Sequence, residues 1–68
     1  MTKMNLRSAD VRRALAAADP LTAVEIGAWL RMPVREVNIA LRYLIRTMQV
    51  RVCADGRYEL TPYGEEML

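Results

Sequence analysis

The residues best suited to chemistry in this sequence are arginines, and they are concentrated in one stretch of the chain. Five arginines lie between residues 31 and 51, where Glu36 is the only acidic residue. From Glu59 onward the chain carries three acidic residues and no basic one. A guanidinium group is always charged and donates several hydrogen bonds, so arginines without acidic neighbours are suited to binding anionic groups such as phosphates.

The residue types that are missing exclude most catalytic chemistry. The sequence has no histidine, a single cysteine (Cys53) and no glycine-rich phosphate loop. Histidine-based general base catalysis, Ser-His triads and His or thiolate metal sites are therefore excluded. Glu65 and Glu66 are adjacent carboxylates that are typical of a solvated acidic tail. We expect no enzyme activity, no bound metal and no cofactor.

Length and composition predict one globular domain over residues 1–68. The net charge is only +2, and hydrophobic residues make up 53% of the chain, enough for a small core. The alanine-rich stretch at 11–18 is interrupted by Arg12 and Arg13 and is too short to span a membrane. One cysteine allows no disulfide within the chain, which fits a reducing compartment. We expect a cytoplasmic protein with no membrane association.

Capping residues mark the first two helices. Ser8 as N-cap and Pro20 beyond the end predict a helix over about residues 9–18. Thr22-Ala23-Val24-Glu25 has the pattern of a capping box, in which Thr and Glu side chains each accept from the other's backbone amide. This box predicts a second helix over about residues 23–30.

A third helix follows after a connection of three or four residues. Pro33 suits its start, because proline lacks the N–H that a first helical turn leaves unbonded, and the pattern continues over residues 34–48. Two helices joined by so short a connection predict a helix-turn-helix.

The third helix has two different faces when it is plotted at about 100° per residue. One face is apolar and is expected to join the core, with Val37, Leu41, Leu44 and Met48 at its centre and Val34 and Ile45 beside them. Arg35, Arg42 and Arg46 cluster on the opposite face, flanked by Asn38 and Ile39. No acidic residue lies at helical spacing to neutralise these arginines. An arginine face is often simply solvated, but the second helix of a helix-turn-helix is the one that enters the major groove of DNA.

A β-hairpin is predicted over residues 50–60. A three-residue loop with Gly56 in the left-handed region pairs Val52 with Tyr58, Val50 with Leu60 and Arg51 with Glu59. The four apolar residues of these pairs then face the third helix. A two-residue Asp-Gly turn would instead mix apolar and charged residues on one face.

The chain is expected to finish in a short turn or helix. Thr61 is its predicted N-cap and Pro62 its first residue. The apolar end, Met67-Leu68, either closes the core or binds a second subunit.

The order of these elements resembles the winged helix-turn-helix transcription regulators, in the broad sense that includes the MarR-like and PadR-like groups. The resemblance covers residues 21–64 and rests on the order of its parts. The matching residues are Glu25-Ile26-Gly27, Leu30, Val37, Leu41 and Leu44, then Gly56-Arg57-Tyr58 and Leu60-Thr61-Pro62-Tyr63-Gly64. It implies a mainly α-helical fold: a three-helix core, a two-stranded wing and a short C-terminal turn or helix. It also implies that the third helix reads the major groove while the wing touches the adjacent backbone.

Residue by residue, the resemblance implies two kinds of DNA contact. The groove-facing positions would be Arg35, Asn38, Ile39 and Arg42, and the phosphate contacts would be Arg46 and Arg57. The expected function is sequence-specific binding of double-stranded DNA by a small transcriptional regulator. A domain of this size makes few contacts, so a homodimer or a larger protein partner is expected.

A second interpretation is a winged helix that binds proteins and has no nucleic-acid role. It is favoured by Ile39 in the middle of the arginine face, by Trp29 on the flank of the second helix, and by the modest net charge. Because a fold alone does not decide function, both interpretations stay open at the level of sequence.

Overall fold

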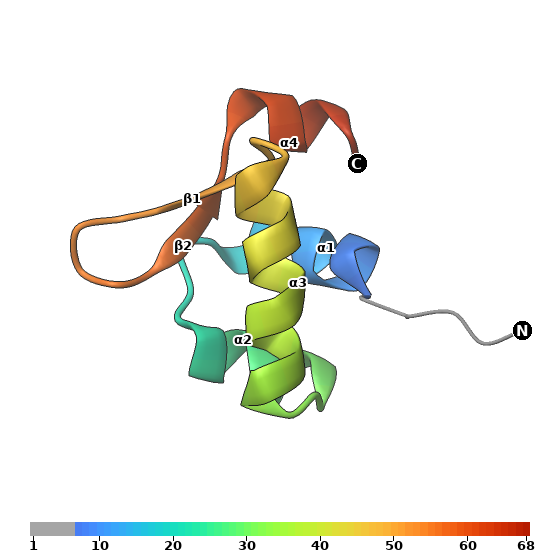
Figure 1. Ribbon diagram of the computed structural model, residues 1–68, viewed down its shortest axis with the longest axis vertical. Helices are drawn as coiled ribbons and strands as arrows, with labels where there is room; N and C mark the ends of the chain where they lie inside the picture. The colour runs from blue at the N-terminus through green and yellow to red at the C-terminus, as the bar shows by residue number, and fades with distance from the viewer. Residues whose placement is uncertain (1–6) are drawn as a thin grey trace, which may run out of the picture.

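Three helices pack against one another and carry an antiparallel hairpin along one side, followed by a short helix (Figure 1). The computed structural model describes residues 7–68. In chain order the elements are α1 (Ser8–Ala18), α2 (Ala23–Leu30), α3 (Val34–Arg46), β1 (Val50–Val52), β2 (Tyr58–Leu60) and α4 (Pro62–Glu66). This is the topology of a winged helix, and it confirms the fold expected from the sequence.

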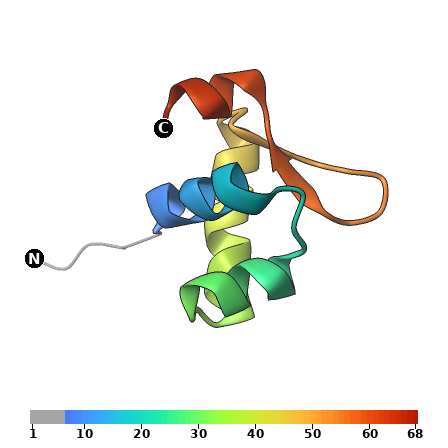
Figure 2. The ribbon, with the colours of Figure 1, turned by 180° about the vertical axis from the view of Figure 1, so that it is seen from behind.

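The core lies where α1, α2, α3 and the hairpin meet, and the view from behind shows α1 lying across α3 (Figure 2). Nearly every element contributes to it, and its buried members are Val11, Leu15, Leu21, Ile26, Met32, Val37, Ala40, Leu41, Leu44, Val50 and Leu60. Removing this apolar surface from water is the main favourable contribution to folding. The side chains of α3 therefore fall into two groups: those buried in the core, which stabilise the domain, and those exposed on the surface, which are available for binding.

The start of α1 differs from the sequence prediction. Ser8 is the first helical residue and not the cap; Arg7 occupies the N-cap position in a left-handed conformation, with no side-chain cap. Asp10 in the first turn accepts hydrogen bonds from Arg7 and Arg13, each at 2.9 Å. The hydrogen bond from Arg7 lowers the pKa of Asp10 below its usual value. Ion pairing around Asp10 thus takes the place of a serine cap.

The start of α2 is as predicted. The Thr22 hydroxyl accepts from the Glu25 amide at 3.1 Å, and the Thr22 amide donates to a Glu25 carboxylate oxygen at 2.9 Å. Both halves of the capping box are therefore formed. At the other end of α2, Arg31 adopts a left-handed conformation that turns the chain toward Pro33, the N-cap of α3.

Two predictions about α3 were wrong: its end was placed two residues too late, and Met48 was placed in the core. The helix ends at Arg46, where the Thr47 hydroxyl donates to the carbonyl of Tyr43 and competes with helical bonding. Met48 then takes a left-handed conformation with φ 68°, and the Gln49 amide donates back to the Leu44 carbonyl at 2.8 Å. Met48 consequently points away from the core and is 70% exposed.

The buried face of α3 is rotated relative to the prediction. Val34 and Ile45, expected beside the core, are exposed, whereas Ala40 is fully buried. A small side chain such as that of Ala40 allows a neighbouring helix to approach α3 closely. The rotation leaves Arg35 and Arg46 pointing almost directly away from the core.

The hairpin has the predicted register: Val50 pairs with Leu60, Arg51 with Glu59 and Val52 with Tyr58. Gly56 adopts φ 89°, the left-handed conformation that the three-residue loop requires. One part of the prediction was wrong, since Val52 is 55% exposed. The hairpin diverges from α3 toward its loop, so the residue nearer the loop has no helix to cover it (Figure 1).

The connection between α1 and α2 forms an additional bridge to the hairpin that the sequence did not predict. Leu21 and Tyr58 exchange two backbone hydrogen bonds, of 3.1 and 2.7 Å. The Leu60 amide donates to the carboxylate of Asp19 at 3.2 Å. Strand β2 is therefore bonded along both of its edges, and this fixes its position beside α3.

The last helix is attached through its cap. The Thr61 hydroxyl accepts from the Gly64 amide at 3.0 Å, as predicted for an N-cap, and donates to the Met48 carbonyl at 2.6 Å. The Thr61 amide donates to the Gln49 carbonyl. Gly64 packs on the same carbonyl so closely that a Cβ there would lie 2.0 Å from the oxygen.

Beyond α4, the terminal residues Met67 and Leu68 are exposed and do not close the core.

Candidate nucleic-acid interface

The arginine face of α3 is open to solvent along its whole length. Arg35, Asn38, Ile39, Arg42 and Arg46 are all exposed, as the sequence predicted. None of them is among the side chains that α3 buries in the core, which are Val37, Ala40, Leu41 and Leu44. The helix therefore presents these residues together on one accessible surface, which we call the α3 outer face.

The arginines of the α3 outer face have no acidic partners. Among the described residues, neither Arg35, Arg42 nor Arg46 forms an ion pair or a side-chain hydrogen bond. The ion pairs of residues 7–68 lie instead on α1, around Asp10, and on the hairpin. The positive charge of this face is thus left uncompensated by residues 7–68, which favours an anionic partner.

Arg57, the sixth residue predicted at the interface, has a different environment. It lies in the hairpin loop and pairs with Asp55 at 3.6 Å, while the Asp55 carboxylate also accepts from the Arg57 backbone amide at 3.1 Å. On the outer surface of the strands, Arg51 pairs with Glu59. The hairpin therefore carries equal numbers of positive and negative side chains, and the structure does not bring Arg57 into the unpaired group on α3.

Arg31 is an additional arginine that sequence reasoning counted but did not assign to the interface. It lies in the turn before α3, is exposed and has no ion-pair partner among the described residues. Its left-handed conformation, φ 56°, is part of the helix-turn-helix connection. The sequence feature that could have assigned Arg31 to the interface is its position in the basic stretch, three residues before α3 begins.

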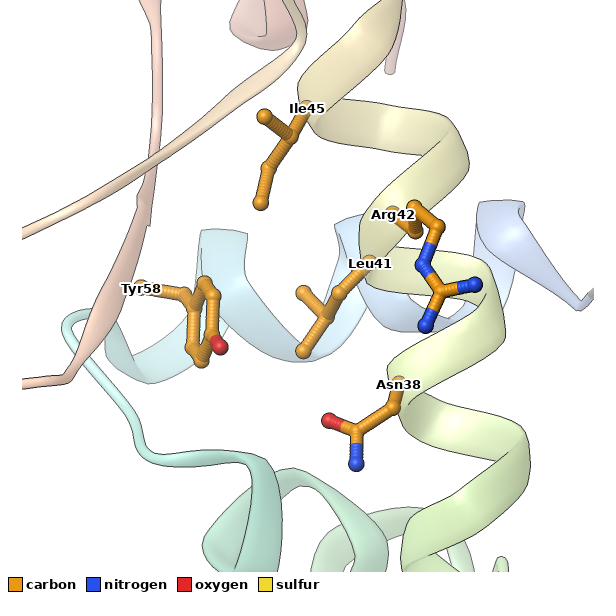
Figure 3. Close-up of a pocket in the computed structure, with 5 residues that line it drawn as sticks. All are labelled: Asn38, Leu41, Arg42, Ile45 and Tyr58. Carbon is orange, nitrogen blue, oxygen red and sulfur yellow. The ribbon is translucent and has the colours of Figure 1, made fainter.

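A hollow of about 220 Å³ lies between α3 and β2. Figure 3 shows five side chains around it: Asn38, Leu41, Arg42, Ile45 and Tyr58. Leu41 and Ile45 supply apolar walls, and the other three supply hydrogen-bond donors. Sequence reasoning placed Tyr58 on the core side of the hairpin, and the structure leaves it half-buried with its ring facing this hollow.

Cys53 is not set up as a reactive thiol. It is half-buried beside the hairpin loop, and desolvation raises the pKa of its thiol, with the carboxylates of Glu59 and Asp55 adding to the effect. A raised pKa keeps the thiol protonated and weakly nucleophilic at neutral pH. Within residues 7–68, no three side chains of the metal-binding types come together as a candidate metal site.

Comparison with known proteins supports the fold and adds no function. No protein-family model matches the sequence, and no curated protein is similar to it. A solved structure from Listeria innocua, of a protein of unknown function, superposes with a TM-score of 0.85 at 21% sequence identity. The superposition covers 90% of this chain and 45% of the Listeria chain, so this chain spans less than half the length of that protein.

No helix within residues 7–68 combines the length and the apolar character needed to cross a bilayer.

Proposed function

We propose that the protein binds double-stranded DNA sequence-specifically, with α3 in the major groove, and acts in the cytoplasm as a small transcriptional regulator of the MarR-like or PadR-like kind. The single observation that carries the proposal is the set of exposed arginines on the α3 outer face that have no acidic partner among the described residues. The major groove of B-DNA admits an α-helix and displays acceptors that arginine and asparagine can recognise.

The side chains of the α3 outer face divide into those that can read bases and those that can bind phosphate. Arg35 and Arg42 can donate to guanine edges, Asn38 can pair with adenine, and Ile39 can contact a thymine methyl group. Arg46 is proposed as a phosphate contact that positions the helix without reading sequence. Arg57 is proposed as a second phosphate contact, made from the hairpin.

The proposal includes a partner and excludes catalysis. One domain of this size buries little DNA surface, so we propose that a homodimer or a larger protein partner supplies the remaining contacts. No catalytic residue and no cofactor enter the proposed function.

A salt titration tests the proposal. Fluorescence anisotropy of a labelled duplex, repeated over a series of salt concentrations, gives the slope of log K against log salt. We expect binding that weakens steeply with salt, with a slope approaching about −0.9 for each phosphate contacted. Absence of binding to duplex DNA at low salt would refute the proposal.

A second candidate function, protein binding, is favoured by apolar side chains on the surface. Ile39 is 42% exposed in the middle of the α3 outer face, and Trp29 on α2 is 55% exposed. If α3 is a protein-binding surface, Ile39→Asp should abolish capture of that protein partner, and no salt-dependent affinity for DNA should be measurable. If α3 binds DNA, the same substitution should weaken duplex binding through charge repulsion.

A further inference from the structure

We infer that the hollow between α3 and β2 holds one phosphate of the DNA backbone, with the hydroxyl of Tyr58 and the guanidinium of Arg42 as its hydrogen-bond donors. The inference rests on the proposed function and extends it, because it adds Tyr58 to the DNA-binding residues. It also revises the role of Arg42, which then binds a backbone phosphate in place of a guanine edge.

The donors around the hollow are unused within the part of the chain that the structure describes. Asn38, Arg42 and the Tyr58 hydroxyl make no side-chain hydrogen bond to any other described residue. In Figure 3 the tyrosine ring extends from β2 toward α3, and its hydroxyl lies on the side of the hollow nearer Asn38. The Arg42 guanidinium runs along α3 in the direction of Asn38 (Figure 3). Side chains from two elements, α3 and β2, thus bring unused donors to the rim of one hollow.

The charge and the size of the hollow fit a phosphate group better than a larger ligand. Arg42 is the one charged residue that lines it, and no carboxylate does. Leu41 and Ile45 supply the apolar part of its wall and bring no competing charge. The volume of about 220 Å³ is below the roughly 300–1,000 Å³ of pockets that enclose drug-sized molecules.

The position of the hollow identifies the phosphate as one of the DNA backbone. With α3 in the major groove, the phosphates that border the groove run along the sides of the helix, and the hairpin stands at one of those sides (Figure 1). The hollow lies between the two. The backbone of Tyr58 is held beside α3 by its two hydrogen bonds to Leu21, so the residue that carries the hydroxyl has a fixed place in the fold.

The closing experiment compares Tyr58→Phe with the wild type. The substitution removes one hydroxyl and leaves the ring that packs beside α3. Because a hydrogen bond to a charged group is a strong one, we expect duplex affinity to fall about tenfold, equally for a preferred and a scrambled duplex. The salt slope should not change, since tyrosine is neutral, whereas Arg42→Ala should reduce the slope by about 0.9. Tyr63→Phe on α4, an exposed tyrosine outside the hollow, is the matched control and should bind as the wild type does.

The possible outcomes separate the inference from the proposed function. Wild-type affinity in Tyr58→Phe, with salt-dependent binding by both proteins, would overturn the phosphate site and leave DNA binding standing. A loss confined to the preferred duplex would also overturn it, because the hydroxyl would then read a base. Failure of the wild type itself to bind any duplex would overturn the proposed function and the site together. Equal thermal unfolding of the variants would exclude misfolding as the cause of a loss.

Discussion

At the scale of single residues, the arginines of this protein differ in what surrounds them, and their environments predict different effects on DNA binding. Arg13 on α1 forms an ion pair with Asp10 at 2.9 Å, whereas Arg46 on α3 has no ion-pair partner among the described residues. An arginine that is already paired contributes little net attraction to a distant anion. An unpaired one contributes its full charge.

We therefore expect Arg46→Ala to weaken binding to all duplexes alike and to reduce the salt slope by about 0.9, because a phosphate contact carries no sequence information. Arg13→Ala removes the same charge from the surface of α1 and serves as the control, with a slope close to that of the wild type. Fluorescence anisotropy over a salt series measures both. Equal slopes for Arg46→Ala and the wild type would contradict the phosphate contact.

Asn38→Ala should behave differently from Arg46→Ala. If Asn38 pairs with an adenine, its loss should cost about 1–3 kcal/mol on the preferred site and relax the preference at that base pair, with little change for unrelated DNA. Competition between the preferred duplex and single-base variants measures this preference. A uniform loss across all sequences would show that Asn38 does not read a base.

Gly64 is the residue whose replacement should damage the fold most directly. A Cβ at this position would lie 2.0 Å from the Gln49 carbonyl oxygen, which accepts a hydrogen bond from the Thr61 amide, so one of the two backbone segments must shift. We expect Gly64→Ala to lower the free energy of unfolding by about 2–3 kcal/mol in urea titrations. Gly56→Ala, which has open space but φ 89°, should cost only about 1 kcal/mol. A smaller loss in Gly64→Ala than in Gly56→Ala would contradict this packing.

At the scale of elements, the hairpin and α3 differ in charge. The arginines of the hairpin, Arg51 and Arg57, pair with Glu59 and Asp55, whereas the arginines of α3 have no such partners among the described residues. Near DNA, Asp55 would face phosphates of the same sign. The hairpin thus combines one proposed phosphate contact with a carboxylate that opposes it.

Asp55→Asn should consequently strengthen DNA binding. Asparagine keeps the side-chain oxygen that accepts from the Arg57 amide, so the loop should retain its shape, while the negative charge is removed. We expect the affinity for any duplex to rise by a factor on the order of three, and the salt slope to become steeper. Glu65→Gln on α4 removes the same charge away from the hairpin and should change neither quantity. An unchanged affinity in Asp55→Asn would indicate that the loop does not approach DNA.

The elements also show which features the sequence could predict. Periodicity along α3 is a local property, so the outward direction of its arginines followed from spacing alone. The hairpin register followed from alternation and from the need for a left-handed Gly56. The end of α3 could not be predicted from the local pattern. It depends on hydrogen bonds from Thr47 and on contacts of Met48 and Gln49 with Thr61, which lies beyond the hairpin.

The hollow between α3 and β2 and the bridge between Leu21 and Tyr58 could not be predicted from local sequence patterns either. Leu21 and Tyr58 are far apart in the sequence, and nothing in their neighbourhoods indicates that they pair. The hollow requires Tyr58 to lie across from Asn38 and Arg42, which only the packing of β2 on α3 determines.

At the scale of the whole molecule, a small core is accompanied by apolar side chains that nothing covers. Trp29 on α2 and the terminal Met67 and Leu68 are all exposed. Covering apolar side chains of this size with a second subunit would remove them from water, which is favourable. We expect concentration-dependent dimerisation, measurable by sedimentation equilibrium, with Trp29→Ser or Met67→Ser shifting the equilibrium toward the monomer. A wild-type protein that stays monomeric at high concentration would leave a different protein partner as the source of the extra contacts.

The bonding of β2 on both edges also bears on how the protein avoids aggregation. A strand with open backbone groups can recruit a strand from another chain, which is a common route to insoluble assemblies. Here the connection that contains Asp19 and Leu21 occupies one edge of β2, and β1 occupies the other. The outer edge of β1 spans three residues and has the charged Arg51 at its centre. Short length and a central charge both discourage strand addition, so the exposed Val52 does not turn the hairpin into an adhesive surface.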